Sequence, residues 1–176
     1  CIGGIVRADS VQAASLKIRY SGKTRYYKGK QLHVSYANKN LSSKYVGIQI
    51  NKVNMIPYYD YLVKQGPKVK RTYSKSSGKL ILKNGDDTLT AYVGKRTYYL
   101  NGVKKTFSVA PTKVKYYKTK KTIILIPANA IVKGLGLNYK YSSSSKRIYI
   151  TQPVIPSDST TQVQTQPSGS VQYTNY

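Results

Sequence analysis

The side chains that usually carry catalysis are scarce in this sequence. Among 176 residues there are one histidine, one cysteine and five acidic residues, all of them aspartate. A structural zinc site needs about four cysteine or histidine ligands, and a copper site needs clustered imidazoles. His33 lies in the alternating run LHVSY, which predicts a strand residue rather than a catalytic base. We therefore expect no metal site, no cofactor and no catalytic residue.

The aspartates give no better support for an enzyme. Asp86 and Asp87 follow Asn-Gly in the run NGDD, and adjacent acidic residues in a turn usually face solvent. A glycosidase needs two carboxyl groups placed across a cleft. The sequence therefore favours a non-enzymatic protein.

Lysine and arginine, by contrast, are abundant. There are 30 of them against five acidic residues, which gives a formal net charge of +25 at pH 7. Such a charge attracts polyanions, which include nucleic acid, anionic lipid headgroups, and the phosphate-bearing polymers and acidic glycans of a cell envelope. The densest basic runs are KVKR at 68–71 and KVKYYKTKK at 113–121. The candidate polyanion-binding residues are Lys68, Lys70, Arg71, Lys113, Lys115, Lys118, Lys120 and Lys121.

Strand alternation would place Lys113 and Lys115 on one face, where they form a stripe. Alternatively, these lysines only solvate edge strands and deter aggregation. The 19 tyrosines also have two interpretations. Paired tyrosines in strands usually place one ring in the core and the other on the outer face. An exposed tyrosine row would alternatively stack on carbohydrate or on bases.

A duplicated unit positions these residues. The run GKTRYYKGK at 22–30 recurs as GKRTYYLNGV at 94–103. Likewise MIPYYDYLVKQG at 55–66 aligns with LIPANAIVKGLG at 125–136. The order of hairpin, loop, Pro-opened segment, Gly stop and strand is therefore written twice, at a spacing of about 70 residues.

Local patterns identify the elements of this unit. Alternating apolar and polar residues, punctuated by Gly22 and Gly29, predict strands joined by turns, and Asn101-Gly102 predicts a hairpin. Pro127 suits the first turn of a short helix and Gly136 suits its left-handed end. The predicted fold class is α+β: a duplicated β-hairpin, short helix and strand unit, with a twisted antiparallel sheet packed on one or two short helices.

The chain divides into three parts by composition. Residues 16–152 form the predicted domain, with repeats at about 16–84 and 88–152. Residues 153–176 are rich in Ser, Thr, Gln and Pro and predict a disordered linker or tail. Residues 1–15 resemble either the remnant of a secretory signal, with VQA before a cleavage position, or a tether with a lipid on Cys1. A frayed end of a cytosolic protein is the third interpretation.

Three runs carry a resemblance to a known family: YYLNGVKKTFSVAP at 98–111, TIILIPANAIVKGLG at 122–136 and YKYSSSSKRIYI at 139–150. They resemble the stalk domain that is similar to the N-terminal domain of bacterial copper amine oxidases, found on secreted and surface proteins of Gram-positive bacteria. The resemblance covers 89–151 well and 16–82 more weakly. It implies an α+β fold, a structural or adhesive role, and neither the copper nor the quinone of the oxidase.

The sequence departs from the family pattern in the helix and in the last hairpin. Asn129 and Lys133 stand where the family commonly has Arg and an acidic residue, and Tyr141-Ser142 stand where it favours Trp-Asp. These positions are neither turn nor core positions, so the fold expectation is unaffected, while any ion pairing of the helix is in doubt.

Taken together, the sequence predicts a secreted or cell-surface structural or adhesive module of the Gram-positive envelope, with anionic wall polymers or acidic glycans as partners. One alternative is a nucleic-acid-binding protein that uses basic, tyrosine-rich strands. Another is an accessory domain of a larger extracellular enzyme.

Overall fold

The computed structural model describes residues 15–154, and strands dominate this part of the chain. The strands are β1 (Leu16–Tyr20), β2 (Lys23–Tyr27), β3 (His33–Tyr36), β4 (Lys39–Asn40), β5 (Ile48–Ile50), β6 (Val53–Pro57), β7 (Lys70–Ser74), β8 (Lys79–Asn84), β9 (Asp87–Tyr92), β10 (Thr97–Leu100), β11 (Val103–Thr106), β12 (Thr112–Tyr116), β13 (Lys121–Pro127), β14 (Asn138–Ser142) and β15 (Arg147–Thr151). The two helices are the π-helical η1 (Tyr59–Lys64) and the α-helix α2 (Ala128–Gly134). Many strands with two short helices agree with the α+β expectation in its coarse form. The expected signal remnant, lipid-bearing Cys1 and tail fall on residues 1–14 and 155–176, outside the described residues.

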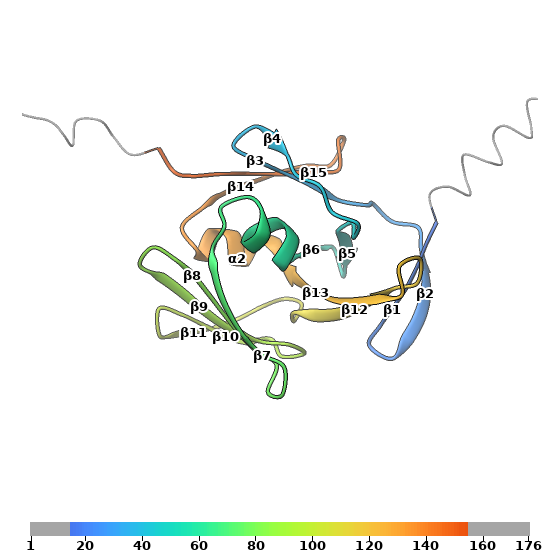
Figure 1. Cartoon of the computed structure of the whole chain (residues 1–176), viewed down its shortest axis with the longest axis horizontal. Helices are drawn as coiled ribbons and strands as arrows, with labels where there is room; N and C mark the ends of the chain where they lie inside the picture. The colour runs from blue at the N-terminus through green and yellow to red at the C-terminus, as the bar shows by residue number, and fades with distance from the viewer. Residues whose placement is uncertain (1–14, 155–176) are drawn as a thin grey trace, which may run out of the picture.

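The strands form three sheets around the two helices. Their orders are β2-β1-β12-β13-β6-β5, β11-β10-β9-β8-β7 and β14-β15-β3-β4. Figure 1 shows the helices at the centre, with the five-stranded and four-stranded sheets on either side and the six-stranded sheet extending away from them. The sequence predicts a twisted antiparallel sheet on one or two short helices, and the structure divides the strands among three sheets. In addition, β15 pairs parallel with β3, while the other strand pairs are antiparallel within the described residues.

The two Pro-opened segments lie side by side. Strands β6 and β13 pair antiparallel with Ile56 opposite Ile126, while Pro57 faces Leu125 and Met55 faces Pro127. The burial pattern of 53–62 is repeated at 123–132, residue for residue. Because β12 and β13 insert between β1 and β6, the first and second halves of the chain share one sheet.

The end of α2 forms as the sequence predicts. Gly136 has φ +78°, its N–H donates to the carbonyl of Lys133 (3.0 Å), and the N–H of Leu137 donates to the carbonyl of Val132 (3.1 Å). This pair of bonds is the Schellman arrangement, which satisfies carbonyls that the helix leaves unpaired. The positive φ favours glycine at this position, and a Cβ added to Gly136 would lie 2.7 Å from Asp87 Oδ2, so the Asp87 carboxylate would have to shift.

The first tyrosine-paired run does not close into a second hairpin. Gly22 (φ +72°) does turn β1 into β2, but Gly29 is only a bend, after which the chain crosses to the four-stranded sheet as β3. The hydroxyl of Tyr27 donates to the carbonyl of Lys30 (2.6 Å) and folds its ring over the bend. A Cβ at Gly29 would lie 2.7 Å from that ring, so this glycine is there for space rather than for a turn.

The apolar residues form two cores. The larger one surrounds the two helices and includes Tyr61, Leu62, Ile131 and Val132. The smaller one lies under the six-stranded sheet; its buried members are Ile18, Ile48, Ile50, Met55, Val109, Val114, Tyr116 and Leu125. Burial of these side chains supplies the main stabilisation of the fold.

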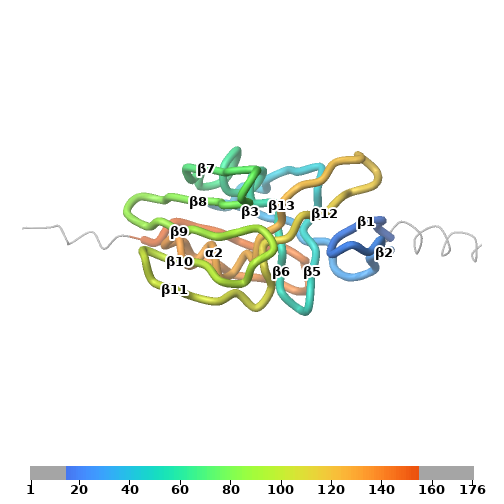
Figure 2. The backbone as a smooth tube through the Cα atoms, turned by 90° about the horizontal axis from the view of Figure 1, so that it is seen from below, coloured from blue at the N-terminus to red at the C-terminus, as the bar shows by residue number. Residues whose placement is uncertain are grey.

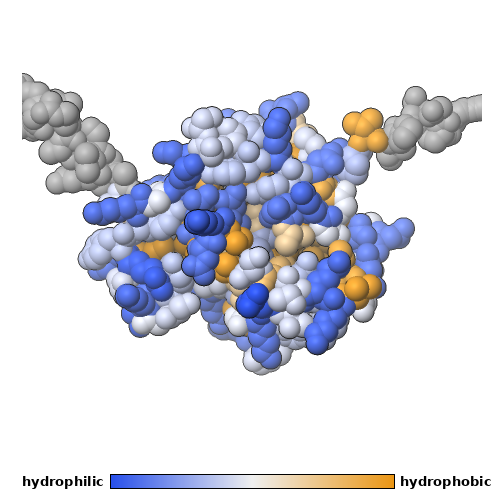
Figure 3. All heavy atoms as spheres, turned by 180° about the vertical axis from the view of Figure 1, so that it is seen from behind, coloured by the Kyte–Doolittle hydropathy of each residue, from blue (hydrophilic) through white to orange (hydrophobic). Residues whose placement is uncertain are grey.

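The first and last described residues lie at opposite ends of the molecule (Figure 2). Within residues 15–154, neither helix has the length and apolar character needed to cross a membrane. The face seen in Figure 3 is mostly hydrophilic, with small and separated apolar spots.

Candidate polyanion-binding surface

The basic side chains of the described region are not neutralised by carboxylates. Asp60 accepts a hydrogen bond from Ser43 Oγ (2.7 Å), and Asp87 accepts one from Asn101 Nδ2 (3.0 Å). Both donors are uncharged. No lysine or arginine in residues 15–154 forms an ion pair with an aspartate. The positive charge of this surface therefore remains available to an external anion.

Several cations lie instead over tyrosine rings. The contacts join Lys17 to Tyr26 (5.8 Å from ammonium nitrogen to ring centroid) and to Tyr117 (4.5 Å), Lys115 to Tyr117 (5.0 Å), Arg25 to Tyr20 (4.0 Å), Arg71 to Tyr59 (4.9 Å) and Lys95 to Tyr92 (5.7 Å). A ring attracts a cation through its quadrupole without cancelling its charge. The tyrosines thus position the cations and leave the electrostatic field intact.

The adjacent tyrosine pairs place one ring inward and one outward, as the sequence predicts. Tyr58, Tyr98 and Tyr116 are buried, whereas their neighbours Tyr59 and Tyr99 are 44% and 37% exposed. In the pair on β2 the first ring, Tyr26, is 65% exposed and the second is half-buried. Two of the outward rings contact cations: Tyr26 lies against Lys17 and Tyr59 lies against Arg71.

The first predicted basic run lies at the edge of the five-stranded sheet. Lys70 and Arg71 are exposed on edge strand β7, and Lys68 precedes it with φ +53°. Lys70 stands directly opposite Lys83 of β8. Arg71 donates from Nη1 to the hydroxyl of Tyr58 (3.1 Å), so it is held in place.

The second predicted run lies in the six-stranded sheet. On β12, Lys113 and Lys115 share the face opposite buried Val114 and Tyr116, which confirms their predicted alternation. Lys118 and Lys120 lie in the turn after β12, and Lys121 begins β13; these three are exposed.

The two runs occupy different places. A hollow of about 310 Å³ is lined by Lys68, Lys70 and Lys83, with Asn84. A separate cleft of about 680 Å³ includes Lys113 and shares no lining residue with that hollow. The structure therefore does not combine the predicted lysines into one site.

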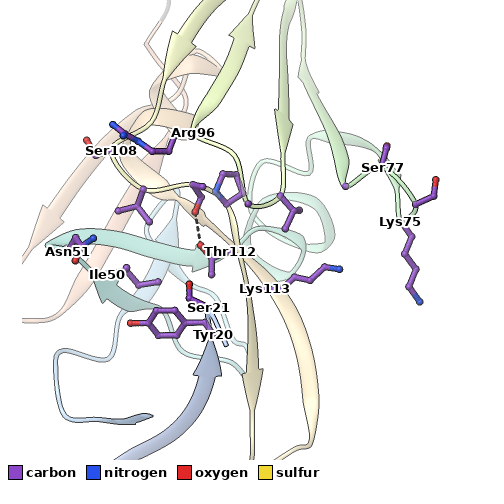
Figure 4. A pocket seen from close by; sticks show the side chains of 17 residues that line it. Tyr20, Ser21, Ile50, Asn51, Lys75, Ser77, Arg96, Ser108, Thr112 and Lys113 are labelled. Atoms are coloured by element: carbon purple, nitrogen blue, oxygen red, sulfur yellow. Dashed lines mark hydrogen bonds between the residues drawn. The ribbon is translucent and has the colours of Figure 1, made fainter. Parts of the chain in front are cut away.

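The cleft at Lys113 gathers cations that the sequence analysis missed. It is formed by the turn between β1 and β2, the turn between β5 and β6, the turns after β7 and β9, and residues 108–113. Its charged lining residues are Lys75, Arg96 and Lys113, with no acidic residue among them. Figure 4 shows Lys75 and Lys113 on one side of the cleft and Arg96 on the other. Lys75 is a single cation in its turn and Arg96 has only Lys95 beside it, so neither belongs to a dense basic run.

Hydrogen bonds fix two of the lining side chains. Arg96 donates from Nε to the carbonyl of Phe107 (2.8 Å), and Thr112 donates from Oγ1 to the carbonyl of Ala110 (2.7 Å), the bond drawn in Figure 4. Further hydroxyls come from Ser21 and Ser108. Positive charge with neutral donors suits a phosphate or carboxylate group that binds without any reaction.

His33 lies on β3 and is exposed, as predicted for a strand residue. Partial desolvation of the ring, followed by the nearby charges of Arg147 and Lys146, lowers the pKa of His33 from the ordinary value of 6.5. The imidazole is therefore neutral at pH 7 and adds nothing to the positive field.

Comparison with known proteins identifies one relationship. The family model described as the copper amine oxidase N-terminal domain matches residues 36–150. No curated protein and no solved structure matches the chain.

Proposed function

The chain belongs to the copper amine oxidase N-terminal domain family, a family of non-catalytic domains, and from this premise we propose that it is a non-enzymatic module that associates with anionic polymers of a cell envelope. The observation that carries the proposal is the set of cations without carboxylate partners: the three that line the cleft at Lys113 and, outside the cleft, those that lie over tyrosine rings, such as Lys17 and Lys115.

The copper in the family's description does not transfer to this chain. Its sequence has a single histidine, and residues 15–154 contain no group of three or more His, Cys, Asp or Glu side chains placed to hold a metal ion. Copper sites in proteins are built from several nitrogen and sulfur ligands. The described residues therefore do not fit a copper site.

Association would depend on many weak contacts. An exposed ion pair contributes about 0–1 kcal/mol and is screened by salt. A net charge of +25 nevertheless makes the summed attraction to a polyanion large at low ionic strength. Binding should therefore be tight at low salt and fall steeply as salt is added.

Secretion, and a place on the surface of a Gram-positive cell, form part of the proposal. Residues 15 and 154 lie at opposite ends of the described part of the chain, which supports a spacer role for the module. Two other roles compete with wall association: nucleic-acid binding through the same cations, and service as an accessory domain of a larger extracellular enzyme.

The test is co-sedimentation of residues 16–152 with isolated Gram-positive cell walls, before and after removal of the anionic polymers, across a salt series. We expect binding that is lost with the polymers and with salt. A variant of the cleft, K75Q/R96Q/K113Q, should bind less than the matched triple variant K79Q/K105Q/K140Q, which removes the same charge outside the cleft. Full retention on stripped walls, or no retention on intact walls at low salt, would contradict the proposal.

A further inference from the structure

One face of the six-stranded sheet carries a second group of cations, centred on Tyr117. The register of β1 and β12 places Arg19 opposite Lys115, and the N–H of Tyr117 donates to the carbonyl of Lys17 (3.2 Å). Residues 17 and 19 point away from buried Ile18, and residue 115 points away from the buried side of β12. These side chains therefore meet on the outer face of the sheet.

The phenol of Tyr117 connects the group. The ammonium nitrogens of Lys17 and Lys115 lie 4.5 and 5.0 Å from its ring centroid. Its hydroxyl lies 3.1 Å from Thr24 Oγ1, which accepts a hydrogen bond from Arg19 Nη1 (3.0 Å). We call these five residues, Lys17, Arg19, Thr24, Lys115 and Tyr117, the Tyr117 cluster.

The Tyr117 cluster holds three positive charges and no negative charge. Like charges directly opposite each other on neighbouring strands are destabilising, and Arg19 faces Lys115 in this way. The hydrogen bond with Thr24, followed by the charges of Lys115, Arg19 and Lys17, lowers the pKa of Tyr117. None of the three cations has a carboxylate partner in the described residues. A bound anion would relieve this repulsion.

The chemistry of the Tyr117 cluster favours phosphate over carboxylate or base. Lysine binds phosphate as a point charge, whereas planar carboxylates are matched best by the fork of an arginine, and only one of the three cations is an arginine, with one of its N–H groups already donated to Thr24. Proteins that hold single-stranded nucleic acid present successive open aromatic rings. Here two ammonium groups lie over the ring of Tyr117, and that of Lys17 also lies 5.8 Å from the centroid of the exposed Tyr26 ring, so no row of open rings stands beside the cluster.

We propose that the Tyr117 cluster binds the phosphate groups of a phosphodiester-linked envelope polymer that lacks bases. This inference rests on the proposed function, because it names the polymer class and a place where the module holds it. The three cations contact the phosphate oxygens, and Thr24 and Tyr117 keep the cations in position. No covalent step is involved.

The experiment uses protein labelled with ¹³C at the tyrosine Cζ, in which the Tyr117 signal is assigned by its absence in Tyr117→Phe. The probes are an oligomer of glycerol phosphodiesters, polygalacturonate as a carboxylate polymer, and oligothymidylate, each added at a fixed moderate salt concentration. We expect a saturable shift of the Tyr117 signal with the glycerol phosphodiester oligomer at the lowest concentration. The pKa of Tyr117, followed by the same signal, should rise towards its ordinary value when the oligomer saturates the protein.

Matched double variants locate the binding. K17Q/K115Q should weaken the binding of the oligomer about tenfold and reduce its salt dependence, because two phosphate contacts are lost. K105Q/K140Q removes the same charge from exposed positions on β11 and β14 and should change affinity less than about twofold by the same reasoning. Urea denaturation of each variant checks that it is folded.

The outcomes separate the two proposals. If the protein sediments with intact walls while the Tyr117 signal stays still, or if both double variants lose affinity equally, the association is diffuse and the phosphate site is overturned while the proposed function stands. An equal response to polygalacturonate overturns the phosphate preference. A stronger response to oligothymidylate overturns the inference in favour of nucleic acid. Failure to sediment with walls at all overturns the proposed function itself.

Discussion

Replacing Tyr116 by phenylalanine should destabilise the protein at neutral pH and stabilise it in strong alkali. The Tyr116 ring is buried and packs edge-on against Tyr45 (5.2 Å between centroids). Its hydroxyl donates a short hydrogen bond to the carbonyl of Val46 (2.6 Å). Burial raises the pKa of this phenol well above the ordinary value of 10.

The expected magnitude at pH 7 follows from the lost hydrogen bond. Tyr116→Phe leaves the Val46 carbonyl without this donor, and an unsatisfied buried acceptor costs about 1–2 kcal/mol of unfolding free energy. The aromatic packing is retained, because phenylalanine keeps the ring.

Above pH 10 the difference in unfolding free energy between the variant and the unchanged protein shrinks and then changes sign. A raised folded-state pKa means that this contribution to stability is complete below pH 10 and falls as the unfolded chain ionises while the folded Tyr116 stays protonated. The loss is about 1.4 kcal/mol per pH unit for one such group. Because phenylalanine has no proton to lose, the deficit of the variant should cancel near about pH 11 and reverse beyond it.

The measurement is urea denaturation of both proteins at intervals from pH 7 to pH 11.5. Tyr61, whose pKa burial raises to about 12, and the lysines titrate in both proteins, so the difference removes their effects apart from the electrostatic coupling of Tyr61 to Tyr116. A deficit that stays constant across this range would mean that Tyr116 ionises as readily in the folded protein as in the unfolded chain, and the reasoning would be refuted.

Two further predictions concern the fold. Gly136→Ala should lower the free energy of unfolding by about 1–3 kcal/mol in urea, since φ is +78° and the new Cβ would meet Asp87 Oδ2; an unchanged midpoint would contradict the Schellman assignment. Residues 16–84 alone should remain unfolded, because strands of this half pair with strands of the other half in the six-stranded and four-stranded sheets. The amide NMR signals of this fragment should show poor dispersion. A cooperative unfolding transition of the fragment would refute this expectation.

Local signals in the sequence were sufficient for elements that satisfy their own hydrogen bonds. The left-handed end of α2 at Gly136 is one example, because it depends on residue type. The start differs: Pro127, predicted in the first turn of the helix, is the last residue of β13 and has an extended backbone. The hairpin turn at Asn101-Gly102 is another: both residues have positive φ, as a tight hairpin turn requires. These elements are predictable because nothing distant decides them.

Elements whose partners lie far away were not predictable in this way. The sequence predicts a hairpin turn at Gly29. In the structure the ring of Tyr27 packs over Gly29, and the chain continues into β3 of the four-stranded sheet. The parallel pairing of β3 with β15 joins strands that lie at opposite ends of the domain sequence. Alternation of residues fixes which face of a strand is buried, but it does not choose the neighbouring strand.

The candidate sites show the same limit. The runs 68–71 and 113–121 were found because they are dense, whereas Lys75 and Arg96 were missed because neither lies in a dense basic run. Lys17 reaches the neighbourhood of Lys115 because β1, the first strand, pairs with β12. Only the fold makes these cations neighbours.

The arrangement of charge argues that the cations serve an external partner rather than the fold. A structural role would place aspartates beside them, but the hydrogen bonds to Asp60 and Asp87 come from neutral side chains. A contact between a cation and an exposed ring contributes only about 0.5–1 kcal/mol and leaves the charge in place. A net charge of +25 therefore costs stability through self-repulsion. An anion that binds the folded state offsets that cost. The same positive charges that destabilise the isolated module by mutual repulsion would therefore bind it to a polyanion.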